Sequence, residues 1–191
     1  MSYDPVAAAS EVLLQENKIS QRVRELGEQI SNDYRGRHLH MIGILKGAWV
    51  FMADLIRHLD DVEVTVDFLG IASYGGGTTS SGQVKITKDL DQSIEGLEVL
   101  AVEDILDTGL TFTYLQKMLN ARKPKSLKLV ALLDKASRRQ MPVYADYVGF
   151  TIPDLFVVGY GLDYAQRYRE LSEIRVLHPT PEDAGVRAAG H

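Results

Sequence analysis

The stretch from residue 99 to residue 111, VLAVEDILDTGLT, constrains the fold more than any other part of the chain. Its apolar run reaches the adjacent carboxylates Glu103 and Asp104, as is typical of a buried parallel strand that ends at the mouth of a site. The Asp-Thr-Gly-Leu-Thr segment at residues 107–111 then opens a helix, where free backbone N–H groups and the helix dipole favour a phosphate. Carboxylates beside a phosphate repel it unless a hard cation such as Mg²⁺ lies between them. The stretch therefore predicts a magnesium-bound phosphoester ligand.

Length and composition bound the possible classes of protein. The 191 residues suit one domain with a full core, which we expect over residues 11–178, with a disordered tail over residues 180–191. A net charge of −5 predicts no general affinity for nucleic acid or membrane surfaces. The absence of cysteine excludes disulfides and thiolate metal sites. Because neither a transmembrane-length apolar run nor a leader peptide is recognisable, we expect a cytoplasmic location.

Strand and helix patterns alternate along the chain after a loose lead-in over residues 1–10. Apolar spacing predicts helices over residues 11–34, with an N-cap at Ser20, and over residues 48–59 and 110–121. Apolar or alternating runs predict strands at residues 39–45, 62–71, 99–106, 127–133, 147–152 and 174–178. This alternation predicts a doubly wound α/β fold with a mostly parallel sheet.

A run of only Gly, Ser and Thr occupies residues 75–82, between Ser73-Tyr74 and the strand-like residues 84–87. Such a run cannot bury apolar area, so it is mobile unless a ligand orders it. It is either an exposed hairpin tip or a lid, of about residues 73–90, that closes over a reactive intermediate.

Polar residues follow several of the predicted strands: Lys46-Gly47, Glu103-Asp104 with the 107–111 loop, and Lys135. Each has an ordinary explanation by itself, as a solvated strand end, surface charge or a simple helix cap. Because ligands of such sheets bind at the carboxyl ends of the strands, we expect these residues to converge in one site.

Six segments of the chain resemble, in order, those of the bacterial hypoxanthine-guanine phosphoribosyltransferases, a 6-oxopurine branch of the type I phosphoribosyltransferase family. The segments lie at residues 43–48, 66–68 with 73–75, 102–111, 132–135, 148–150 with 152–154, and 156–164 running into Arg169. The acidic pair with Asp-Thr-Gly specifies only the superfamily, whereas FVVGYGLDY at residues 156–164 points to the purine enzymes. Ala72 departs from relatives that carry a lysine there, so no role of that lysine transfers to this chain.

The resemblance implies a type I phosphoribosyltransferase fold: a central, mostly parallel twisted sheet flanked by helices, with a small hood subdomain and a flexible lid loop. It also implies the reaction, in which hypoxanthine or guanine and 5-phosphoribosyl-1-diphosphate give the nucleotide (IMP or GMP) and pyrophosphate with Mg²⁺. Xanthine is a further candidate base, and the chain does not decide among the three. The family also implies a homodimer or homotetramer.

The family pattern further implies roles around the ribose. Glu103 and Asp104 would hold the ribose hydroxyls and Mg²⁺. Asp107 would take the proton from purine N7 as general base, or stabilise the charge that develops in the transition state. Thr108, Gly109, Leu110 and Thr111 would bind the 5′-phosphate, completing a phosphoribosyl site with Glu103, Asp104 and Asp107.

Roles toward the purine and the pyrophosphate follow in the same way. Lys135 would donate to purine O6, which disfavours adenine because its amino group is a donor. Phe156 would stack on the base, the Val157 backbone would read its edge, and Asp163 would bind a second Mg²⁺ and lie near the purine 2-position. Lys46, Gly47 and Arg169 would bind pyrophosphate, the Leu45–Lys46 peptide would be cis, and Ser73 and Tyr74 would belong to the lid.

Two alternatives belong to other classes of protein. A nucleic-acid-binding regulator on the same fold needs a basic face, whereas this acidic chain disperses its basic residues and retains a base-recognition segment. A receiver-like phosphate-binding domain also uses acidic strand ends with Mg²⁺ but leaves Lys135, Phe156 and Asp163 unexplained. We therefore favour the enzyme.

Overall fold

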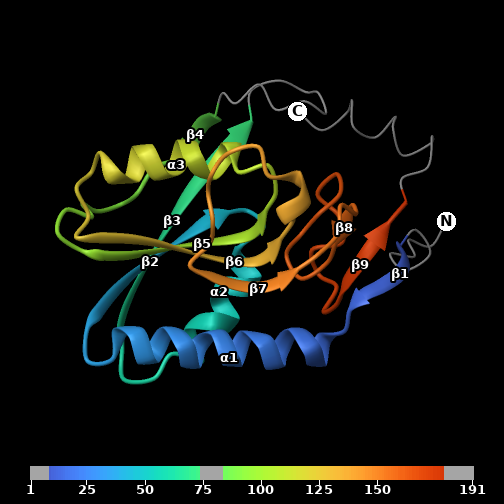
Figure 1. Ribbon diagram of the computed structural model, residues 1–191, viewed down its shortest axis with the longest axis horizontal. Helices are drawn as coiled ribbons and strands as arrows, with labels where there is room; N and C mark the ends of the chain where they lie inside the picture. Colours follow the sequence, from blue (N-terminus) through green and yellow to red (C-terminus); the bar gives the residue numbers. More distant parts are fainter. Residues whose placement is uncertain (1–8, 74–83, 179–191) are drawn as a thin grey trace.

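A six-stranded sheet forms the centre of the computed structural model, which describes residues 9–73 and 84–178 (Figure 1). Its spatial order is β4-β3-β2-β5-β6-β7. The strands are β2 (His38–Leu45), β3 (Glu63–Ser73), β4 (Val84–Lys88), β5 (Glu98–Leu106), β6 (Ser126–Asp134) and β7 (Tyr147–Thr151). All neighbouring pairs are parallel except β3 with β4. The predicted mostly parallel sheet is confirmed.

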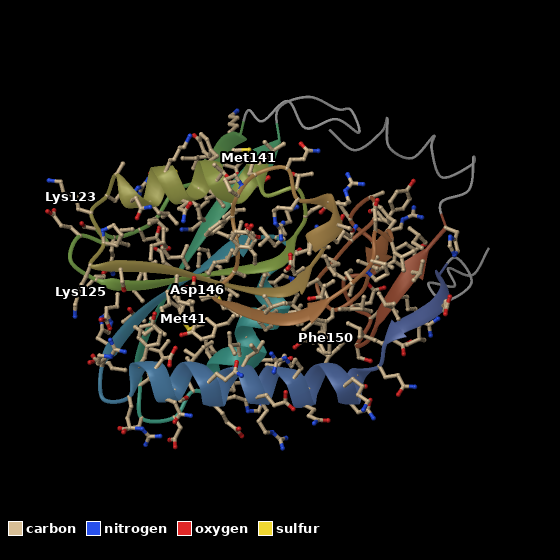
Figure 2. The ribbon with its side chains drawn as sticks, viewed as in Figure 1. Met41, Lys123, Lys125, Met141, Asp146 and Phe150 are labelled. Carbon is tan, nitrogen blue, oxygen red and sulfur yellow. The ribbon has the colours of Figure 1, made fainter. Side chains whose placement is uncertain are left out.

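Helices cover both faces of this sheet, which explains why its inner strands are apolar on both sides. Helices α1 (Glu16–Tyr34) and α2 (Trp49–Ile56) lie on one face, and α3 (Leu110–Asn120) lies on the other (Figure 1). Figure 2 shows Met41 and Phe150 on the α1 side and Met141 on the α3 side, and these residues belong to two separate apolar clusters. The parallel sheet is therefore buried between two cores.

The N-terminal prediction is wrong in its boundaries. The helix begins at Glu16 after Gln15, not at residue 11 or at a Ser20 cap, and Ala9–Leu14 forms strand β1. β1 pairs antiparallel with β9 (Ile174–Leu177) at the far end of the chain. The local apolar spacing of residues 11–14 is compatible with a helix. These residues nevertheless form a strand, because pairing with the distant β9 outweighs the local preference.

A second, three-stranded sheet forms the predicted hood, with the order β1-β9-β8. Strand β8 is only Val157–Val158 and pairs with β9. Figure 1 shows this sheet beyond the carboxyl ends of β6 and β7. The hood therefore brings the 156–169 segment to the edge of the central sheet where the site is expected.

Part of the predicted lid and the predicted tail lie outside the described residues, namely residues 74–83 and 179–191. Ser73 is the last residue of β3 and pairs with Val84, the first residue of β4. Tyr74 is not described, so the lid stays a prediction. In the two described ranges, no helix is long and apolar enough to cross a membrane.

A buried carboxylate ties β3 to the segment that follows β4. Asp67 is 5% exposed, and its Oδ1 accepts the Phe68 N–H at 2.6 Å and the Lys88 ammonium at 3.4 Å. Its Oδ2 accepts the Asp91 N–H at 2.8 Å. Burial raises the pKa of Asp67, but these donors together outweigh burial and hold the pKa below its usual value. The ionised carboxylate therefore stabilises the fold.

Asp67→Asn is expected to lower the free energy of unfolding by about 1–3 kcal/mol at neutral pH, because the amide leaves one buried donor without an acceptor. Since the folded pKa lies below the unfolded one, the stabilisation is complete above the unfolded value of about 4 and disappears as the pH falls through the folded pKa. Urea unfolding of both proteins at neutral and acidic pH measures this. Asp91→Asn is the control. The Asp91 side chain also pairs with Lys88 but is 75% exposed, so this substitution should change the free energy of unfolding little. A difference between wild type and the Asp67 variant that stays constant with pH would contradict this account.

Candidate active site

Three adjoining cavities lie at the carboxyl ends of the central strands. The cradle cavity, of about 300 Å³, is lined by the acidic pair and the loop after β5. The hood cavity, of about 560 Å³, is lined by Lys135 and the start of β8, and the basic cavity, of about 310 Å³, by Lys46, Lys88 and Arg169. Asp107 lines the first two cavities, Asp104 the first and third, and Asp163 the second and third. The predicted convergence of these segments is therefore observed.

The loop between β5 and α3 forms the floor of the cradle cavity. Gly109 has a φ of 82°, and a Cβ there would lie 2.5 Å from Val143 Cγ1, so both conformation and space require glycine. The N-cap residue Gly109 has no side chain to cap α3, its carbonyl accepts from the Thr113 hydroxyl at 2.7 Å, and Thr108 Oγ1 accepts the Leu110 N–H at 3.4 Å. Thr108, Gly109 and Thr111 line the cavity. The start of α3 thus faces the cavity, where N–H groups of its first turn can bind an anion.

Leu110 is the exception among the predicted cradle residues. Its side chain does not line the cavity, and its backbone N–H points to Thr108 Oγ1 at 3.4 Å. Only its backbone belongs to the loop that surrounds the cavity.

Glu103 and Asp104 are two adjacent acidic residues near the carboxyl end of β5. Glu103 is 7% exposed, and burial together with the Asp104 charge raises its pKa well above its usual value. Burial also raises the pKa of Asp104, to about 6, against the opposing effect of the Ile105 N–H, which donates to Oδ1 at 2.8 Å. In the described part of the chain, neither residue forms an ion pair within 4.0 Å. The ionised forms of these two carboxyl groups are therefore destabilised, and a bound cation would offset this cost.

The chemistry of this pair fits Mg²⁺, which prefers carboxylate oxygens and keeps several water or phosphate ligands. Within residues 9–73 and 84–178, no cluster of three or more His, Cys, Asp or Glu side chains could hold a metal ion. Substrate and water oxygens would therefore have to complete the coordination, as is usual where Mg²⁺ accompanies a phosphorylated substrate.

The loop after β2 packs directly against the acidic pair. The Leu45–Lys46 peptide is cis, as expected, and Gly47 lies so close to Asp104 that a Cβ on Gly47 would overlap the carboxylate. Gly161 packs against the backbone of Gly47, where a Cβ on Gly161 would overlap Gly47 O. Glycine at both positions allows three chain segments to meet at the acidic pair.

The hood cavity combines one buried cation with an exposed aromatic ring. Lys135 is 7% exposed, and Phe156 is 42% exposed although it is large and apolar. The Phe156 ring meets Tyr164 edge-on, at 5.6 Å between centroids and 88° between planes. Val157, which is buried, continues from it into β8. The free face of Phe156 and the nearby Lys135 ammonium suit a flat heteroaromatic ligand with an acceptor atom.

Residues of the hood and of the β2 loop meet around the basic cavity. The Arg169 guanidinium lies 2.7 Å from Asp163 Oδ1 and donates to Gly161 O at 2.6 Å. Lys46 Nζ donates to Gln166 Oε1 at 3.0 Å. Two cations thus flank one edge of the site beside Asp104 and Asp163, where an anion and its counter-ion can both bind.

Three residues to which the sequence assigned no role also belong to this region. Arg138 and Asp154 line the hood cavity, while Arg139 donates to the Asp107 and Leu106 carbonyls and pairs with Asp134. Arg138 and Arg139 follow Lys135 closely in the sequence. Only the spatial placement of β5, β6 and β7 reveals which carboxylates these arginines contact.

Comparison with known proteins agrees with this architecture. A family model described as "Phosphoribosyl transferase domain" matches residues 10–165. The hypoxanthine-guanine phosphoribosyltransferase of Bacillus subtilis (strain 168) is 53% identical over 168 residues, which cover 88% of this chain and 93% of the relative. That of Streptococcus pyogenes serotype M3 (strain ATCC BAA-595 / MGAS315) is 48% identical over 87% of this chain and 92% of the relative.

Solved structures give the same result. A hypoxanthine phosphoribosyltransferase from Staphylococcus aureus superimposes with a TM-score of 0.88 at 48% identity, covering 94% of this chain and 97% of that one. Sequence motifs, strand order, hood and relatives all agree. The chain therefore belongs to the phosphoribosyltransferase family, in its hypoxanthine-guanine branch.

Proposed function

We propose that the protein transfers the phosphoribosyl group of 5-phosphoribosyl-1-diphosphate to hypoxanthine or guanine. The bond between ribose C1′ and the diphosphate oxygen breaks, the bond from C1′ to purine N9 forms, and the purine loses its N7 proton. The observation that carries this proposal is the meeting of three cavities around Asp104, Asp107 and Asp163. Each cavity has the chemistry of one part of the substrates.

The cradle cavity suits the ribose 5′-phosphate. The backbone N–H groups of residues 109–111 and the hydroxyls of Thr108 and Thr111 would donate to its oxygens. Glu103 and Asp104 would accept from the ribose hydroxyls and hold Mg²⁺. When bound, Mg²⁺ supplies positive charge that offsets the diphosphate and the buried carboxylates.

The hood cavity suits the purine. Phe156 would stack on the base, the Val157 backbone would read its edge, and the Lys135 ammonium would donate to O6. Asp107 lines both this cavity and the cradle, so its carboxylate could reach the N7 proton while the ribose lies next to it. An anion at that point would also stabilise a cationic ribosyl transition state.

The basic cavity suits the leaving pyrophosphate. Lys46, the Gly47 backbone and Arg169 would bind its oxygens, and Asp163 would hold a second Mg²⁺. Ser73 and Tyr74 would begin the lid that excludes water from the activated ribose.

Three broader expectations accompany this proposal. The chain would act as a single domain, in the cytoplasm, without nucleic-acid or membrane partners. It would form a homodimer or homotetramer, which the exposed Trp49 and Val66 on α2 and β3 support as apolar surface. Light scattering of the purified protein measures the assembly.

The base specificity tests this proposal. With Mg²⁺ and the ribosyl diphosphate, hypoxanthine and guanine should give nucleotide at least about 10³-fold faster than adenine, because a donor on the base would face the Lys135 donor. Xanthine, measured in the same assay, determines how the 2-position is read. Equal rates with adenine and hypoxanthine would contradict the assignment of the hood cavity, and RNA binding without nucleotide formation would favour the regulator instead.

Lys135→Ala is expected to lower kcat/KM for hypoxanthine by about 10²-fold while changing that for adenine much less. The hypoxanthine-to-adenine ratio, measured by nucleotide formation, reports this loss of discrimination. Lys123→Ala, on the far end of the sheet, is the control and should leave the ratio unchanged (Figure 2). An unchanged ratio in the Lys135 variant would rule out its contact with O6.

A further inference from the structure

Two charged residues without an assigned role connect Lys135 with Asp107 across the hood cavity. Lys135 Nζ lies 3.7 Å from Asp154 Oδ1, and Arg138 Nη1 donates to Asp154 Oδ2 at 3.1 Å. Arg138 Nε lies 2.9 Å from Asp107 Oδ1. Together they form an ion chain of alternating charge, Lys135–Asp154–Arg138–Asp107.

The ion chain crosses the carboxyl ends of three neighbouring strands. Asp107 follows β5, Lys135 follows β6, and Asp154 follows β7, while Arg138 ends the short helix η1 (Ala136–Arg138). These strands are adjacent in the order β5-β6-β7, and all four side chains line the hood cavity. The ion chain therefore surrounds the space proposed for the purine.

Burial differs sharply along the ion chain. The Lys135 side chain is 9% exposed, whereas those of Asp154, Arg138 and Asp107 are 52%, 42% and 40% exposed. A buried ammonium needs a counter-charge, and Asp154 is its carboxylate partner within 4.0 Å in the described ranges. The exposed pairs add little to stability. We therefore expect the ion chain to orient its side chains rather than to contribute much to the stability of the fold.

The planar guanidinium of Arg138 explains how this geometry is fixed. Its Nη1 donates to Asp154 Oδ1 and Oδ2 at 3.3 and 3.1 Å, whereas its Nε lies 2.9 Å from Asp107 Oδ1 as an ion contact without hydrogen-bond geometry, so one planar cation contacts both carboxylates. Lysine at this position would offer a point charge on a flexible stem and could not impose the same arrangement.

We propose that Arg138 and Asp154 are positioning residues of the purine site. Asp154 holds the Lys135 ammonium toward purine O6, and Arg138 binds Asp107 through Oδ1 so that Oδ2 faces the proton on N7. This inference rests on the proposed function, because O6 and N7 become the targets only if a 6-oxopurine binds in the hood cavity.

Steady-state kinetics with both substrates test the two roles separately. Arg138→Gln is expected to lower kcat about tenfold and to leave both KM values within about twofold, since it disturbs a group that acts in the transition state. Arg138→Lys should regain no more than about threefold of that loss, because it restores charge without the planar guanidinium. Asp154→Asn should raise the KM for hypoxanthine about tenfold and leave the KM for the ribosyl diphosphate within about twofold.

Arg122→Gln is the matched control, because Arg122 forms a comparable pair with Asp89 at 2.7 Å, outside the three cavities. It should leave every constant unchanged. An unchanged kcat in Arg138→Gln, full recovery in Arg138→Lys, or an unchanged hypoxanthine KM in Asp154→Asn would overturn the inference. Loss of activity that parallels loss of folded protein in melting curves would also overturn it. Failure of the proposed function is distinct, since the wild type would then make no nucleotide.

Discussion

Replacing Asp107 with Asn is expected to lower kcat for hypoxanthine by roughly 10²–10⁴-fold, the usual contribution of a positioned general base. The amide has nearly the same size but cannot take up the N7 proton and carries no charge to stabilise a cationic ribose. Asp107 suits both roles because it lines the cradle and the hood cavities. Rapid-quench measurement of nucleotide formation in a single turnover reports the chemical step directly.

Binding of the ribosyl diphosphate should change by no more than about threefold in the same variant, since a group that acts only in the transition state contributes little to substrate binding. Calorimetric titration with Mg²⁺ present measures this. Asp91→Asn, whose side chain is 75% exposed and outside the three cavities, serves as the control. A variant with wild-type turnover would exclude Asp107 as the base. A loss of binding that matched the loss of turnover would assign it to substrate binding instead.

Gly47→Ala is expected to lower kcat/KM for the ribosyl diphosphate by about 10²-fold, the effect of displacing a reacting group by about 1 Å. The new Cβ would overlap the Asp104 carboxylate and lie 2.4 Å from its Cγ, so the acidic pair or the β2 loop must move. Either displacement separates groups proposed to hold Mg²⁺ and pyrophosphate. The KM for the ribosyl diphosphate should therefore rise, and the optimal Mg²⁺ concentration should increase.

Gly36→Ala provides the control for this substitution. Gly36 has a φ of 66° but nothing within 4 Å of a Cβ, so alanine there brings backbone strain of about 1 kcal/mol without a steric clash in the site. Its stability should fall while its kinetic constants stay at wild-type values. Wild-type KM values in Gly47→Ala would show that the close approach to Asp104 has no role in substrate binding.

Local sequence patterns were sufficient to locate the five parallel strands of the central sheet. The inner strands are apolar on both faces, and each ends at or directly before a charged residue, so their limits were predicted to within a few residues. The same regularity predicted that Lys46, the acidic pair and Lys135 would meet, because parallel strands end at one edge. The polar residues that line this edge of the sheet could therefore be predicted from the sequence.

Long-range pairing was not readable from local patterns. β1 pairs with β9 across almost the whole chain, with Ala9 opposite Leu177, and no spacing within residues 9–14 encodes that partner. The apolar residues there are compatible with helix or strand, and tertiary contact decides between them. The two-residue strand β8 was missed for the same reason.

Side-chain contacts between strand ends were equally hidden. The link from Arg138 to Asp107 and Asp154 depends on β6 lying between β5 and β7, with Asp134 opposite both Leu106 and Thr151. The contact of Gly47 with Asp104 likewise depends on the register that places Gly43 opposite Val102. The types of residue at the strand ends could be predicted from the sequence, whereas the contacts between them depend on the register of the sheet.

The most direct test of this account is a product measurement on the unmodified protein. The protein is mixed with hypoxanthine, 5-phosphoribosyl-1-diphosphate and Mg²⁺, and both IMP and pyrophosphate are quantified. The account predicts that the two products form in equal amounts, and that removing Mg²⁺ with a chelator abolishes both. Release of pyrophosphate without any nucleotide from hypoxanthine, guanine or xanthine would contradict it.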